Sequence, residues 1–63
     1  MRKGIVQYYL PEKGYGYIRD LESREEFHFT KKDLLEAIQS KDVVYFEVKE
    51  NKHGLYAVNI RIV

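Results

Sequence analysis

The sequence contains no cysteine, which excludes disulfide bonds, thiolate metal sites and a cysteine nucleophile. It has one proline and four glycines, and none of them gather into a flexible or low-complexity stretch, so we expect no linker. No apolar run exceeds four residues, as in Val43–Phe46, which is too short for a membrane-spanning helix or a secretory signal. We therefore expect a cytoplasmic protein in which residues 1–63 form a single domain.

The sequence also lacks an excess of either charge. It carries 11 Lys and Arg against 10 Asp and Glu, which gives a net charge of +1. This balance argues against a polybasic tail and against a protein that coats nucleic acid through charge alone. The charges are nevertheless segregated, because four acids gather between positions 20 and 26 while Arg2, Lys3, Lys13 and Arg19 lie in and around the two segments that precede them.

What the sequence does contain is a series of short segments rich in β-branched and aromatic residues, separated by polar turns. These segments predict five strands, over residues 3–10, 14–19, 25–29, 43–50 and 55–63. After the third strand, Thr30 and Asp33 resemble a capping box, and the apolar residues that follow have helical spacing. We expect a short helix or 3₁₀ turn over residues 31–38.

This order of elements predicts an all-β protein, a barrel of five antiparallel strands with a short helical turn between the third and fourth strands. Closing the sheet removes edges that a 63-residue chain could not otherwise protect. An SH3-like barrel is the alternative that the pattern leaves open.

Six tyrosines are more than the core of so short a chain can hold. Alternation along the second strand places Tyr15 and Tyr17 on the face opposite Ile18, so an inward Ile18 turns both tyrosines outward. Two rings about 7 Å apart suit successive unstacked bases, each of which gains about 1–3 kcal/mol by stacking. We call this pair of exposed rings the ledge, and Gly14 and Gly16 have no side chain that could crowd it. The tyrosines could instead be cross-strand pairs that only stabilise the sheet.

The string KGYGYI at residues 13–18 resembles the ribonucleoprotein motif of bacterial cold-shock proteins, with tyrosine where that family mostly has phenylalanine. Residues 27–30, Phe-His-Phe-Thr, are similar to the second motif of the family, and residues 4–9 resemble its opening segment. The resemblance covers essentially the whole chain. It implies the OB-fold barrel and binding of single-stranded RNA or DNA, with a role as an RNA chaperone or regulator and no enzymatic activity.

The resemblance also assigns binding roles to individual positions. Stacking is implied for the exposed tyrosines and for the aromatic after the motif histidine, while the basic residues contact phosphates or base edges. The nucleic-acid-binding set that we expect is Tyr8, Lys13, Tyr15, Tyr17, Arg19, Phe27, His28, Phe29 and His53. Tyr45 and Tyr56 are expected to be structural, although either could extend the aromatic surface.

The third strand departs from the family pattern by one missing residue. Alignment on His28 places Glu26 where the family has a stacking phenylalanine, whereas alignment on Phe27 turns His28 to the inner face. We favour alignment on His28, because His-Phe-Thr then keeps three residue types. A carboxylate at a base-binding position repels phosphates and offers no stacking, and the loop aromatic of the family is absent. Weaker or altered binding is therefore expected.

Other chemistry has little support in the sequence. His28 and His53 lack carboxylates at a spacing that would complete a metal site, so we expect neither a metal nor a cofactor. Glu25 and Glu26 are adjacent on a strand and point to opposite faces, which is wrong for shared acid–base catalysis. The functional alternative is a protein–protein interaction module, because exposed tyrosines are frequent interface anchors. We expect a monomer or weak dimer that binds single-stranded nucleic acid, or else a protein partner, and no membrane.

Overall fold

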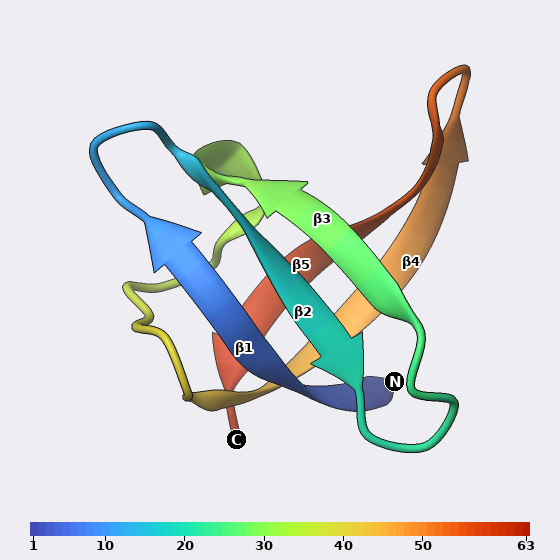
Figure 1. Cartoon of the computed structure of the whole chain (residues 1–63), viewed down its shortest axis with the longest axis horizontal. Coiled ribbons are helices and arrows are strands. Elements are labelled where there is room, and N and C mark those ends of the chain that lie inside the picture. The colour runs from blue at the N-terminus through green and yellow to red at the C-terminus, as the bar shows by residue number, and fades with distance from the viewer.

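The computed structural model describes all residues from 1 to 63 and contains five strands and one 3₁₀ turn. In chain order these elements are β1 (Arg2–Leu10), β2 (Tyr15–Asp20), β3 (Glu26–Thr30), η1 (Lys31–Asp33), β4 (Val43–Asn51) and β5 (Gly54–Ile62). Figure 1 shows the strands curling around a common interior, and they close in the order β1-β2-β3-β5-β4. The predicted five-stranded barrel of the OB-fold type is confirmed. No helix in the structure has the length and apolar character needed to cross a membrane.

The strand directions differ from the prediction at one contact. β1 pairs antiparallel with both β2 and β4, and the pairs β2–β3 and β4–β5 are also antiparallel. β3 and β5 meet in parallel, through the pair His28 and Tyr56. A closed ring with an odd number of strands cannot alternate direction at every contact, so the expectation of a wholly antiparallel barrel is wrong here for a geometric reason.

The barrel is filled by alternate side chains from all five strands and by one residue of the segment before β4. The burial pattern of β2 confirms that Gly16 and Ile18 point inward while Tyr15 and Tyr17 point outward. β5 departs from simple alternation, because Ala57 and Val58 are both buried whereas Ile62, two residues after the buried Ile60, is exposed. The buried cluster consists of Val6, Ile18, Phe27, Phe29, Ile38, Val44, Phe46, Ala57 and Ile60.

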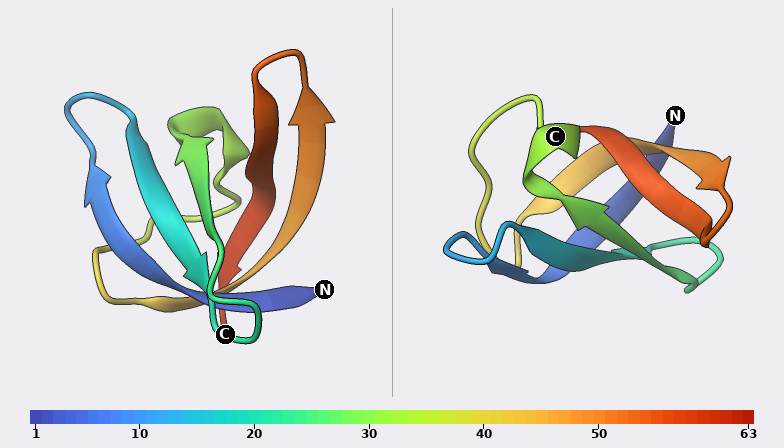
Figure 2. Two further views of the ribbon diagram at one scale, coloured as in Figure 1. Left: turned by 45° about the vertical axis from the view of Figure 1, so that its right-hand side comes forward. Right: turned by 90° about the horizontal axis from the view of Figure 1, so that it is seen from above.

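The connection between β3 and β4 closes one end of the barrel. The Asp33 carboxylate accepts hydrogen bonds from the backbone N–H of Thr30 at 2.9 Å and from its hydroxyl at 3.0 Å, as the capping-box spacing predicts. The helical part stops after η1, so the turn is shorter than the predicted residues 31–38. Beyond it, Leu34 pairs with Ile60, and Ile38 is buried. Figure 2 shows η1 lying beside β5.

Candidate nucleic-acid interface

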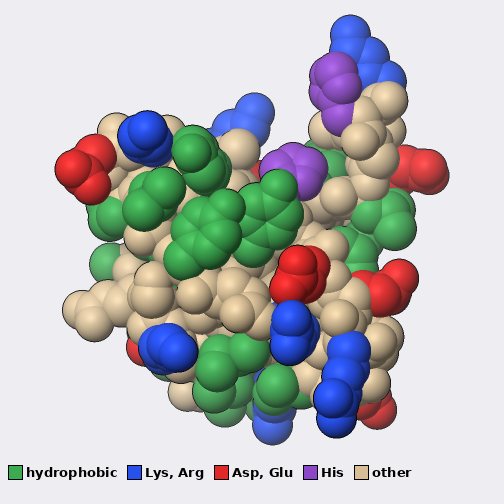
Figure 3. Space-filling model, in the orientation of Figure 1, with side chains coloured by type: hydrophobic (Ala, Val, Ile, Leu, Met, Phe, Trp, Pro, Cys, Tyr) green, Lys and Arg blue, Asp and Glu red, His purple; other side chains and the backbone are tan.

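Four aromatic side chains lie directly opposite one another on four neighbouring strands. Tyr8 on β1 pairs with Tyr17 on β2, Tyr17 pairs with His28 on β3, and His28 pairs with Tyr56 on β5. The successive ring centroids are 5.5, 6.3 and 6.1 Å apart. We call Tyr8, Tyr17, His28 and Tyr56 the aromatic row. In Figure 3, green side chains gather on the face toward the viewer, next to a purple histidine.

The row is partly open to solvent. Tyr8 is 39% exposed and Tyr17 is 38% exposed, while His28 and Tyr56 are half-buried between their neighbours. Tyr15 is exposed on the same face of β2 and stands beside the row, opposite Leu10 and Thr30 rather than another ring. The outward placement of Tyr15 and Tyr17 that alternation predicts is confirmed. A ring held in this way keeps a surface available to a ligand while the rest of it packs on the sheet.

A glycine beneath the row lets β1 and β2 come close together. A Cβ atom added at Gly16 would lie 2.8 Å from Phe29 Cζ and 3.0 Å from Tyr9 Cα, inside the barrel. The expectation that Gly16 clears space around the outer ledge is therefore wrong, because its missing side chain faces the core. Its role is to permit the strand approach that places the Tyr8 and Tyr17 rings 5.5 Å apart.

Phe27 and Phe29 belong to the core and not to the exposed face. They are 3% and 0% exposed, and the Phe29 ring packs against Tyr9 with centroids 5.6 Å apart. Our expectation that these two phenylalanines contact nucleic acid is wrong, because alternation along β3 cannot present them outside as well. The same alternation turns Glu26 and His28 outward. The structure thus agrees with the alignment on His28.

Ion pairs hold two of the cations on β1 and β2. Arg19 and Glu26 are cross-strand partners on β2 and β3, and Arg19 Nη2 donates to Glu26 Oε2 at 3.0 Å. The Arg2 guanidinium lies 3.2 Å from the Asp20 carboxylate. Arg19, which we expected to contact a backbone phosphate, therefore already has a carboxylate partner. Lys13 lies exposed in the β1–β2 turn and forms no ion pair in the structure.

Other cations without an ion pair are exposed around the row. Lys31 is exposed next to the β1–β2 turn, and its backbone N–H donates to Gly14 O at 2.8 Å. Lys49 on β4 lies directly opposite Tyr56, so it extends the row onto β4, the one strand that contributes no ring. His53 is exposed in the turn between β4 and β5, where its backbone N–H donates to Asn51 Oδ1 at 2.8 Å. The structure therefore does not bring His53 into contact with the row.

Sequence reasoning favoured a structural role for Tyr56, although it allowed that this ring could extend the aromatic surface, and it missed Lys49. An inward Ala57 already indicates that Tyr56 points outward. The neighbour of Tyr56 depends on the parallel contact between β3 and β5, which no local pattern specifies. Tyr45, the other tyrosine considered, lies outside the row and has cations over its ring instead, Lys3 and Arg61, each 5.7 Å from the centroid.

The electrostatic setting of Tyr8 reflects its position in the row. Partial desolvation of the side chain is the main cause that raises the pKa of Tyr8, followed by the neighbouring Tyr17, Tyr15 and Glu26. Tyr8 therefore stays neutral around neutral pH and presents an uncharged ring and hydroxyl.

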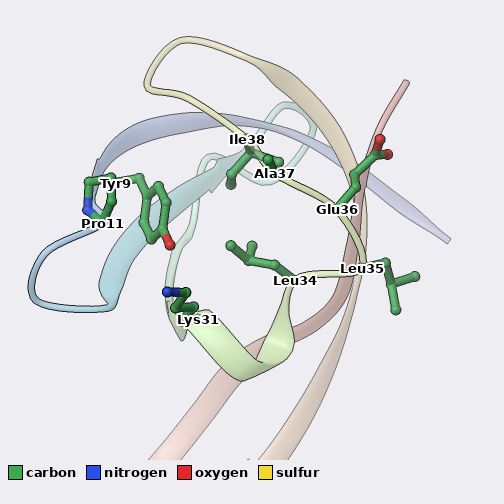
Figure 4. Close-up of a pocket in the computed structure, with 8 residues that line it drawn as sticks. All are labelled: Tyr9, Pro11, Lys31, Leu34, Leu35, Glu36, Ala37 and Ile38. Carbon is green, nitrogen blue, oxygen red and sulfur yellow. The ribbon is translucent and has the colours of Figure 1, made fainter.

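A separate hollow of about 430 Å³ lies at the end of the barrel, where Tyr9 and Pro11 face the segment after η1 (Figure 4). Its lining is mainly apolar, with Lys31 and Glu36 as the charged members. Tyr9 packs on the buried Phe29, so this hollow is not on the face that carries the aromatic row. No group of three or more His, Asp or Glu side chains gathers to hold a metal ion.

The comparison with protein-family models agrees with the motifs and the fold. The family model described as the 'Cold-shock' DNA-binding domain matches residues 2–63, from the first residue of β1 to the end of the chain. A comparison with curated proteins finds no match.

Proposed function

This chain belongs to the cold-shock domain family, a family of nucleic-acid-binding domains, and from that membership we propose that it binds single-stranded RNA or DNA by stacking bases on the aromatic row. The observation that carries the proposal is the alignment of Tyr8, Tyr17, His28 and Tyr56 across four strands of the barrel. A row that crosses strands offers successive rings to the successive bases of one extended strand.

Stacking suits a ligand of varied sequence. Every base has a π-face, so an aromatic surface binds without requiring particular hydrogen bonds. The exposed lysines around the row, Lys13, Lys31 and Lys49, would contact the phosphates of the same strand. Because the surface accepts only unpaired bases, binding shifts the pairing equilibrium of an RNA toward its single-stranded form, which is the physical basis of a chaperone or regulatory role.

The proposal is tested by fluorescence anisotropy with a labelled pyrimidine-rich heptanucleotide. We expect saturable binding by the wild type and a loss of about 1–3 kcal/mol, or about 5- to 150-fold in affinity, for each stacking ring removed in Tyr8→Ala/Tyr17→Ala. Tyr45→Ala is the matched control, because it removes a tyrosine that lies outside the row.

Equal affinity of all three proteins would contradict the stacking mechanism. Absence of binding by the folded wild type would overturn the proposed function as a whole. Sedimentation of the wild type would then test the protein–protein alternative, which predicts an assembly that buries the row.

A further inference from the structure

The ion pair between Arg19 and Glu26 lies on the same face as the aromatic row, one cross-strand pair away from it. Arg19 is two residues from Tyr17 on β2, and Glu26 is two residues from His28 on β3, so the two pairs are neighbours on one face of the sheet. Both charged side chains are 47% exposed. Figure 3 shows a red and a blue side chain in contact just below the aromatic cluster.

Arg19 changes what the Glu26 carboxylate can do. A lone carboxylate on this face would repel phosphates, but the guanidinium 3.0 Å away offsets its charge. The hydrogen bond from Arg19 uses Oε2, and Oε1 accepts no hydrogen bond within the protein. Glu26 is therefore an oriented acceptor with free lone pairs, on a surface where a base would have its ring on Tyr8 or Tyr17.

The carboxylate lies diagonally across from Tyr17, because Glu26 is two residues before His28 on β3 and His28 pairs with Tyr17 on β2. Burial heads the causes that raise the pKa of Tyr8, and the charge of Glu26 is among the others. Tyr17 and Glu26 thus border one place on the sheet face, with the Tyr17 ring for the face of a base and the carboxylate for its edge, and Tyr8 stands on the other side of Tyr17.

We propose that Glu26, positioned by Arg19, makes this place selective for guanine by accepting hydrogen bonds from the N1–H and the 2-amino group. An ionised carboxylate can only accept. Guanine is the one common base whose Watson–Crick edge presents two adjacent donors, whereas adenine and cytosine place an acceptor beside their donor. Uracil and thymine have one N–H between two carbonyls, so the second carboxylate oxygen would face a carbonyl oxygen and be repelled by it.

This inference rests on the proposed function, because it requires a base on the row. It goes beyond that function, because stacking alone is indifferent to base identity. A bidentate contact to a base edge discriminates by about 1–3 kcal/mol, or about 5- to 150-fold. We therefore expect a strand with one guanine to bind the wild type at least about fivefold more tightly than the matched strand without it.

The test uses a thymine heptanucleotide and three derivatives with one central guanine, adenine or cytosine. Only the guanine strand should gain affinity for the wild type. In Glu26→Gln, which keeps the shape but replaces one acceptor with a donor, the guanine preference should fall by about fivefold or more while thymine binding persists. Glu22→Gln is the control, because it removes the same charge from the β2–β3 loop and should keep the preference.

Inosine in place of guanine tests the wild type without any substitution. Inosine lacks the 2-amino donor, so part of the preference should be lost. If all strands bind the wild type equally, or if Glu26→Gln keeps the full preference, the inference is wrong while the proposed function stands. If no strand binds, the proposed function itself fails.

Discussion

Tyr56 is the residue whose substitution best distinguishes a binding surface that spans four strands from one limited to the two exposed tyrosines of β2. Its ring centroid lies 6.1 Å from that of His28, on the side of His28 that faces away from Tyr17. We predict that Tyr56→Ala weakens single-strand binding by about 1–3 kcal/mol, because one stacking ring is lost. Tyr45→Ala should leave the affinity unchanged. Wild-type affinity in Tyr56→Ala would limit the interface to β1, β2 and β3.

Phe29 contributes to stability rather than to binding, because its side chain is fully buried in the core of the barrel. We predict that Phe29→Leu lowers the free energy of unfolding by about 1–3 kcal/mol and leaves the oligonucleotide affinity of the folded protein unchanged. Urea denaturation and anisotropy measured on the same sample give the two quantities. A loss of affinity with unchanged stability would show that Phe29 reaches the ligand after all.

At the scale of a single element, β2 could be predicted almost completely from its sequence. One alternation, Tyr15 and Tyr17 against Gly16 and Ile18, sets both its faces, and the structure agrees. The two faces of β3 could not be assigned in this way. As part of the family motif, Phe27 and Phe29 are expected to bind nucleic acid, whereas as apolar residues of a barrel strand they are expected in the core. Their burial is decided by packing against β1 and β4, which lies outside the pattern of any one strand.

The approach of β1 and β2 depends on Gly16. We predict that Gly16→Ala lowers the free energy of unfolding by about 1–3 kcal/mol, because the new methyl group would crowd Phe29 and the β1 backbone. The change should also weaken nucleic-acid binding, since any separation of the strands moves Tyr8 away from Tyr17. Denaturation and binding that both match the wild type would contradict the close packing.

The β2–β3 loop is organised by the buried Asp20. The backbone N–H of Ser23 is the main cause that lowers the pKa of Asp20; burial opposes it, and the N–H of Glu22 and the Arg2 guanidinium add to the lowering. The folded state therefore favours the carboxylate, so its stabilising contribution is complete above the unfolded pKa of about 3.9. It is lost as the pH falls through the lower folded value.

We predict that Asp20→Asn is less stable than the wild type by about 1–3 kcal/mol at neutral pH. The difference should begin to shrink as the pH falls below about 4, where the unfolded wild-type carboxyl is protonated, and it should be smallest below the lowered folded pKa, where the folded carboxyl is protonated as well. Urea denaturation of both proteins across this pH range makes the comparison. A difference that does not vary with pH would show that Asp20 acts by shape rather than by charge.

At the scale of the whole molecule, the closed ring creates the interface. His28 and Tyr56 are 28 positions apart in the chain, and only the parallel contact between β3 and β5 makes them neighbours. Composition and alternation predict the barrel and the outward tyrosines. They do not predict the row or the position of Lys49 at its end, because both depend on which strands meet when the sheet closes.

The distribution of lysines predicts a modest salt dependence. Lys13, Lys31 and Lys49 are the unpaired cations next to the row. Three phosphate contacts on a single strand give a slope of log K against log salt of about −2. Lys49→Gln should reduce the slope by about 0.7, whereas Lys3→Gln should not change it, because Lys3 lies over Tyr45, outside the row. A slope near zero would contradict phosphate contacts by these lysines.

The most direct test of the central claim is an NMR titration of the protein with a single-stranded heptanucleotide, followed through the aromatic side-chain signals. The row model predicts that the signals of Tyr8, Tyr17, His28 and Tyr56 shift together as the strand binds, while those of Tyr45 stay in place. Shifts centred on Tyr45 and Arg61, or binding with no change at the four rings, would contradict the stacking surface described above.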